Sequence, residues 1–69
     1  MTEDERLDLL DPVSPARAAE IMTARGIPTT ARTIQRYIAE GELAAMPTPG
    51  GHARIKRSVL ERFLRERRQ

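Results

Sequence analysis

Glycine and proline interrupt this sequence so often that no helix or strand in it can be long. Gly26 and Pro28 follow the first apolar segment, Gly41 follows the second, and residues 47–51 read PTPGG. Glycine is favoured just after a helix and proline cannot continue one, so these positions mark the ends of elements. Each segment between them has one apolar side that it cannot bury alone. The chain must therefore pack several short elements around one small core.

The first two long segments have the start signals of helices. Ser14 can cap free backbone amides and Pro15 suits a first helical position, which predicts a helix over residues 15–25. Thr29-Thr30 offers a second cap, for a helix over the segment ARTIQRYIAE. A short turn containing glycine and proline between two helices is typical of a helix-turn-helix.

The second predicted helix has two different faces. At helical spacing, its apolar side chains fall on one side: Ala31, Ile34, Tyr37 and Ile38. The opposite side carries Arg32, Gln35, Arg36 and Ala39 and has no acidic residue. The first side is expected in the core and the second in solvent.

The segment ELAAMPTPGGHARIK predicts two short strands around a Pro/Gly turn. After the turn, Ala53 and Ile55 alternate with His52, Arg54 and Lys56, so the ribbon has an apolar side and a basic side. A two-stranded ribbon this short is stable only when it packs against a helix.

A last helix should follow the ribbon, with Ser58 as its cap. Its apolar stripe consists of Val59, Leu60, Phe63 and Leu64. The order of elements predicts a mainly α fold, a winged helix-turn-helix over residues 13–69 with three helices and a two-stranded β-hairpin wing. Residues 1–12 are expected to form a flexible acidic leader, from which Leu9 and Leu10 can pack back onto the body.

Charge is distributed unevenly along the chain. Residues 1–11 carry five acidic residues against one arginine, whereas residues 12–69 carry eleven basic and five acidic residues. Eleven of the twelve basic residues are arginine, which favours paired hydrogen bonds to phosphate or guanine. The basic body suggests a nucleic-acid partner. The alternative interpretation is that the charged residues only keep the protein soluble.

The chain lacks the residues that several classes of function require. The chain has no cysteine, and its single histidine, His52, has no second histidine, cysteine or aspartate beside it. No nucleophile and base pair, phosphate-binding loop, signal core or membrane-length apolar run is visible. We therefore expect a cytoplasmic, nucleoid-associated protein that is not an enzyme, with no cofactor, no metal and no membrane partner.

The outward side chains of the second helix suit base edges, because arginine pairs with guanine and glutamine with adenine in the major groove. The remaining polar groups near the helices and the ribbon suit the DNA backbone. We expect backbone contacts from Thr29, Thr30, Arg17 and Lys56, and wing contacts from Gly50, Gly51, His52 and Arg54.

Three stretches resemble the excisionase and MerR-like winged-helix family, which includes the small BldC-type regulators. They read SPARAAEIM, TARTIQRYIAEGELAA and GGHARIKRSVLERFL, and together cover about residues 13 to 64. The resemblance implies that Arg32, Thr33, Gln35 and Arg36 lie in the major groove and that His52 and Arg54 contact the adjacent minor groove. The segment MTARGIPTTA makes a longer turn between the helices than the family's compact one, so the resemblance does not fix the angle between the helices or their register in the groove.

These expectations leave three functions open. An excisionase would bind repeated sites on double-stranded DNA cooperatively, bend the DNA and bias a partner site-specific integrase toward excision. A small transcription regulator would use the same domain at promoters. A protein-interaction adaptor would use the basic face on an acidic protein surface and would bind DNA weakly, without sequence preference. We favour the excisionase because no signal-sensing segment is present.

Overall fold

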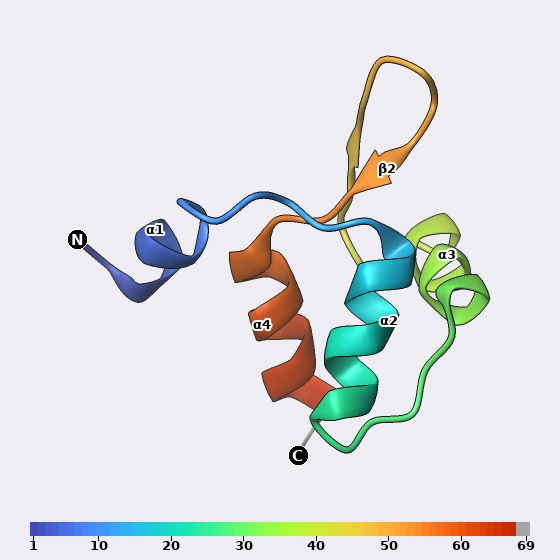
Figure 1. Cartoon of the computed structure of the whole chain (residues 1–69), viewed down its shortest axis with the longest axis horizontal. Helices are drawn as coiled ribbons and strands as arrows, with labels where there is room; N and C mark the ends of the chain where they lie inside the picture. The colour runs from blue at the N-terminus through green and yellow to red at the C-terminus, as the bar shows by residue number, and fades with distance from the viewer. Residues whose placement is uncertain (68–69) are drawn as a thin grey trace.

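The computed structural model describes residues 1–67, which form four helices and one two-stranded antiparallel hairpin (Figure 1). The elements are α1 (Glu3–Leu7), α2 (Pro15–Ala24), α3 (Ala31–Ala39), β1 (Met46–Pro47), β2 (Ala53–Arg54) and α4 (Arg57–Arg67). The three predicted helices are α2, α3 and α4, and the hairpin stands between α3 and α4 as expected. The mainly α winged helix-turn-helix is therefore confirmed, with α1 as an additional helix. The end of the domain predicted over residues 13–69 lies outside the described residues, and that division of the chain stays a prediction.

The predicted caps of the first two body helices are present. The hydroxyl of Ser14 accepts a hydrogen bond from the backbone N–H of Arg17 at 3.2 Å, and Pro15 opens α2. The hydroxyl of Thr30 likewise accepts from the N–H of Thr33 at 3.2 Å at the start of α3. These side chains satisfy N–H groups that have no partner inside the helix. The starts of both helices are thus fixed by local sequence.

The hairpin is short and depends on the rest of the chain. Its register pairs Met46 with Arg54 and Pro47 with Ala53. The next residue, Ile55, exchanges backbone hydrogen bonds of 2.9 and 2.8 Å with Val13, which lies just before α2. The segment that precedes α2 therefore crosses the foot of the hairpin and holds it against the body.

The core lies between α2, α3, α4 and the foot of the hairpin. Its buried members are Val13, Ala18, Ala19, Met22, Ile34, Leu43, Ile55, Leu60, Phe63 and Leu64. Ala18 and Ala19 of α2 are buried in this core, where α2 packs against α3. Burial of apolar surface is the main term that holds these elements together, at about 25 cal/mol per Å².

The acidic leader differs from its predicted form. Residues 3–7 are helical, because Thr2 and Glu5 form a reciprocal capping box at the start of α1. The leader also reaches α4, where the Asp4 carboxylate accepts a hydrogen bond of 3.2 Å from Arg62. The expectation that Leu9 and Leu10 pack onto the body is wrong, since their exposed fractions are 73% and 49%. Val13 is the apolar residue of this region that enters the core.

The predicted cap of the last helix is also wrong. The helix α4 begins at Arg57, so Ser58 lies inside its first turn and is 5% exposed. The backbone N–H and hydroxyl of Ser58 both donate to the carboxylate of Asp8. The acceptor at this helix start thus comes from the leader, far away in sequence.

Side-chain contacts tie α4 to the ends of α2 and α3. The guanidinium of Arg25 lies 2.5 Å from the Glu61 carboxylate, where α2 ends. The rings of Tyr37 and Phe63 lie 5.3 Å apart, and Arg67 stacks over both. The first contact joins the end of α2 to α4, and the ring contacts join α3 to α4. No helix within residues 1–67 is long and apolar enough to span a membrane.

Candidate nucleic-acid interface

The structure brings together the four residues of α3 that were predicted to enter a major groove. Arg32, Gln35 and Arg36 are exposed, and Thr33 is half-buried beside them. These four residues line one shallow hollow on the surface. The opposite side of the same helix is buried through Ile34, which has no exposed surface. The helix thus presents a continuous polar face outward.

Packing of α3 on α2 sets the direction of this face. Ile34 lies in the core with Ala18, Ala19 and Met22 of α2. Rotating α3 about its axis would withdraw Ile34 from that core and leave a cavity, which costs free energy. The orientation of the arginine face is therefore a consequence of the core.

The cations on this face are available to a ligand. Arg36 lies 4.0 Å from Glu40, but the two side chains are 67% and 56% exposed, so water screens the pair and it contributes little. Among residues 1–67, Arg32 has no ion-pair partner within 4.0 Å. Arg36 also lies over the Tyr37 ring, 6.0 Å from its centroid, so an incoming phosphate or base edge would displace only these two weak contacts.

The threonines before α3 are engaged in the turn between α2 and α3. The N–H of Thr29 donates to the Thr23 hydroxyl, which donates back to the Thr29 carbonyl, both at 3.2 Å. The Thr29 hydroxyl donates to the carbonyl of Ile27 at 2.9 Å, so its only hydrogen is in use. The hydroxyls of Thr30 and Thr33 share one hydrogen bond, which leaves one O–H free to donate. Thr30 and Thr33 are thus better placed than Thr29 for a backbone phosphate.

The chain after α3 places the hairpin beside it. The N–H groups of Glu42 and Leu43 donate to the carbonyl of Tyr37 at 2.9 and 3.2 Å. Gly41, with a φ of 79°, adopts the left-handed conformation that lets the chain turn back to form these two hydrogen bonds. Leu43 then enters the core with 2% exposure. The hairpin rises from the body next to α3 and extends beyond the helices (Figure 1).

The tip of the hairpin carries three of the predicted wing residues. Gly50, Gly51 and His52 are exposed, and the two glycines have φ values of 98° and 80°. These are left-handed conformations that other residues adopt only with strain. Lys56, predicted to contact the DNA backbone, is exposed after the second strand. The tip is thus a narrow glycine turn with the ring of His52 close to Gly50.

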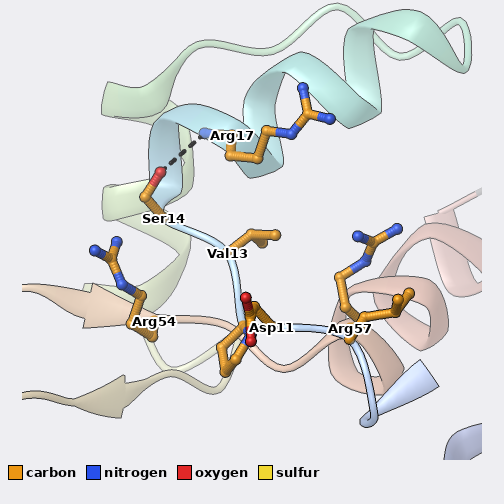
Figure 2. A pocket seen from close by; sticks show the side chains of 8 residues that line it. Asp11, Val13, Ser14, Arg17, Arg54 and Arg57 are labelled. Atoms are coloured by element: carbon orange, nitrogen blue, oxygen red, sulfur yellow. Dashed lines mark hydrogen bonds between the residues drawn. The ribbon is translucent and has the colours of Figure 1, made fainter. Parts of the chain in front are cut away.

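Arg54 lies apart from the other wing residues, at the foot of the hairpin. It shares an open pocket with Arg17, which was predicted to contact the DNA backbone, and with Arg57 (Figure 2). Arg57 was not predicted from the sequence. Arg57 reaches this pocket because residues 11–14 cross over the hairpin. The sequence could have predicted its role only through a signal that Val13 pairs with Ile55.

The arrangement suits recognition more than catalysis. An exposed helix of this width fits a major groove, and a slender ribbon beside it reaches the neighbouring backbone or minor groove. Within residues 1–67, no three His, Cys, Asp or Glu side chains are grouped so that they could hold a metal ion.

Comparison with known proteins agrees with this geometry. A family model described as a helix-turn-helix domain matches residues 23–68 of the chain. The match includes α3, the hairpin and α4, which are the elements that carry most of the candidate interface. No curated protein and no solved structure matches the chain.

Proposed function

The chain belongs to the helix-turn-helix domain family, a family of DNA-binding domains, and on that premise we propose that it binds double-stranded DNA with sequence specificity and without catalysis. In this proposal α3 lies in the major groove. The hairpin is the wing, and its tip at Gly50, Gly51 and His52 lies over the adjacent minor groove.

One observation carries the proposal: α3 has a polar face of two arginines and one glutamine that its own core packing directs into solvent. Ile34 is fully buried on the other side of the helix. Arg32 and Arg36 can each donate two hydrogen bonds to guanine, and Gln35 can pair with adenine. Such a face has chemistry for distinguishing base pairs as well as for neutralising phosphates.

Backbone contacts would set the register of α3 on the duplex. Thr30 and Thr33 are the candidates at the start of α3, and the others are Lys56 just before α4 and Arg17 at the start of α2. Phosphate contacts carry most of the affinity but little sequence information. We therefore expect affinity to fall roughly a thousandfold or more between about 50 and 200 mM salt.

A single domain of this size reads few base pairs, so useful specificity requires several protomers on one DNA. We place the chain in the excisionase role, in which adjacent protomers bind repeated sites cooperatively and bend the DNA for a site-specific integrase. Its resemblance to excisionases supports this role. A BldC-type transcription regulator would use the same surface, and a gene position beside an integrase gene would distinguish the two roles.

Selection from a pool of random duplexes tests the proposed function. Bound sequences should converge on a short motif, and footprinting on an array of that motif should show adjacent protected sites that fill cooperatively. A pool that stays random after several rounds, with binding that depends only on salt, would contradict sequence-specific recognition and would favour a charge-driven adaptor.

A further inference from the structure

Three arginines line the open pocket at the foot of the hairpin. Arg17 comes from α2, Arg54 from β2 and Arg57 from the start of α4, and Asp11 is the only acidic residue in the lining (Figure 2). The pocket has a volume of about 650 Å³. Cations from three different elements thus share this pocket with one acidic residue.

The charges in this pocket are poorly compensated by the protein. Arg54 and Arg57 have no ion-pair partner within 4.0 Å among residues 1–67, and neither reaches Asp11 at that distance. The charge of Arg57 acts on Glu61, one turn along α4, but that carboxylate is already bound by Arg25. Arg17 lies 4.0 Å from Glu20, where both side chains are more than 60% exposed. Like charges that share a pocket repel one another, so an anion is needed to balance them.

Arg57 adds an independent sign that an acceptor is missing. Its Nε is buried and has no hydrogen-bond partner within the described part of the chain. A buried N–H without an acceptor costs free energy and is uncommon in folded proteins. Figure 2 shows the guanidinium groups of Arg54 and Arg57 on opposite sides of the segment that carries Asp11 and Val13, pointing in different directions. A phosphate in the pocket would accept hydrogen bonds from both once one of these side chains changes its rotamer.

We propose that Arg17, Arg54 and Arg57 bind one phosphate group of the DNA backbone, and that Arg57 is required for this contact. The inference rests on the proposed function. A backbone phosphate fits better than a free anion because the pocket opens at the foot of the wing and at the start of α2. In a helix-turn-helix the helix that precedes the recognition helix crosses the DNA backbone. Arg54 then acts as a phosphate ligand and does not enter the minor groove.

The test combines protein variants with neutral DNA linkages. Each phosphodiester of the selected duplex is replaced in turn by an uncharged methylphosphonate, and the dissociation constant is measured for wild type and Arg57→Gln. One linkage should weaken wild type about tenfold and leave Arg57→Gln nearly unchanged. Arg57→Gln should lose affinity equally on selected and random duplexes, with a salt slope smaller by about one. If every linkage affects the two proteins alike, the phosphate contact at Arg57 is refuted.

Control variants distinguish the loss of one positive charge anywhere on the protein from the loss of the charge at Arg57. Arg6→Gln removes one exposed positive charge from α1, outside the pocket, and should change the dissociation constant less than Arg57→Gln does. Asp11→Asn removes the single acid of the pocket and should tighten DNA binding. Arg57→Lys should restore part of the affinity, and it replaces Arg57→Gln if that variant fails to fold. Equal losses for Arg6→Gln and Arg57→Gln would overturn the inference.

A titration with inorganic phosphate distinguishes the two sources of the anion. Amide resonances of residues 54–57 should shift with phosphate in wild type and not in Arg57→Gln, and DNA should displace the phosphate. If the amides of residues 54–57 still respond to added phosphate in the DNA complex, the pocket binds a free anion and the backbone contact is overturned. A wild type that binds no duplex at all would instead refute the proposed function.

Discussion

The carboxylate of Asp8 accepts two hydrogen bonds from Ser58, one from its backbone N–H at 3.2 Å and one from its hydroxyl at 2.9 Å. The two residues lie 50 positions apart in the sequence. The leader therefore supplies the acceptor that the first turn of α4 lacks, in the way that a local cap usually does. These hydrogen bonds lower the pKa of Asp8, first through the Ser58 hydroxyl and then through its N–H.

Stability should fall in acid because of Asp8. Its folded-state pKa lies below the ordinary value of 3.8, so its contribution is fully present well above that pH. The contribution is lost as pH falls through the lowered pKa. We expect the Tm of Asp8→Asn to be below that of wild type at pH 7 and the two to converge as the pH falls through the lowered pKa of Asp8. Asp11→Asn removes the same charge without the bonds to Ser58 and should follow wild type. Parallel curves for wild type and Asp8→Asn down to pH 2 would refute the role of this carboxylate.

Replacing Ile34 tests whether the core orients the recognition face. Ile34→Ala should lower the free energy of unfolding by about 2–5 kcal/mol, because it opens a cavity between α2 and α3. Urea denaturation measures the loss. The neighbouring Gln35→Ala should change stability by no more than about 0.5 kcal/mol, since Gln35 is exposed, but should alter base preference. A comparable loss of stability in both variants would mean that Gln35 does not face solvent in the native protein.

The helices of the body and the two faces of α3 were predictable because the signals are local. A cap, a glycine stop and the spacing of Ile34 and Ile38 all lie within one element. The errors concern contacts between distant segments: Asp8 took the place of Ser58 as the acceptor at α4, and Leu9 and Leu10 stayed in solvent. Arg57 was missed for the same reason, since its surroundings exist only once the chain before α2 crosses the hairpin.

A base contact and a backbone contact should respond differently to mutation. Arg36→Ala should reduce discrimination at one base position by about 1–3 kcal/mol, because a paired hydrogen bond to guanine is lost. Lys56→Ala should weaken all duplexes alike and lower the salt slope by about one. Binding measurements on the selected site and on single-base variants provide the comparison. An equal loss on selected and random DNA for Arg36→Ala would exclude it as a base reader.

The contact between Arg25 and Glu61 should contribute modestly to stability. Their side chains are 37% and 19% exposed, and the hydrogen bond from Arg25 lowers the pKa of Glu61. A double-mutant cycle with Arg25→Gln and Glu61→Gln should give a coupling of about 0.2–1 kcal/mol that shrinks as salt rises. A coupling of zero at low salt would show that the pair does not hold α2 to α4.

Mapping of the DNA-bound surface by amide chemical-shift changes tests the central claim most directly. Titration with the selected duplex should produce the largest changes at residues 32–36 of α3 and at residues 50–54 of the hairpin, with small changes in α1. Changes concentrated on α1 and the exposed side of α4, with α3 unaffected, would contradict the account.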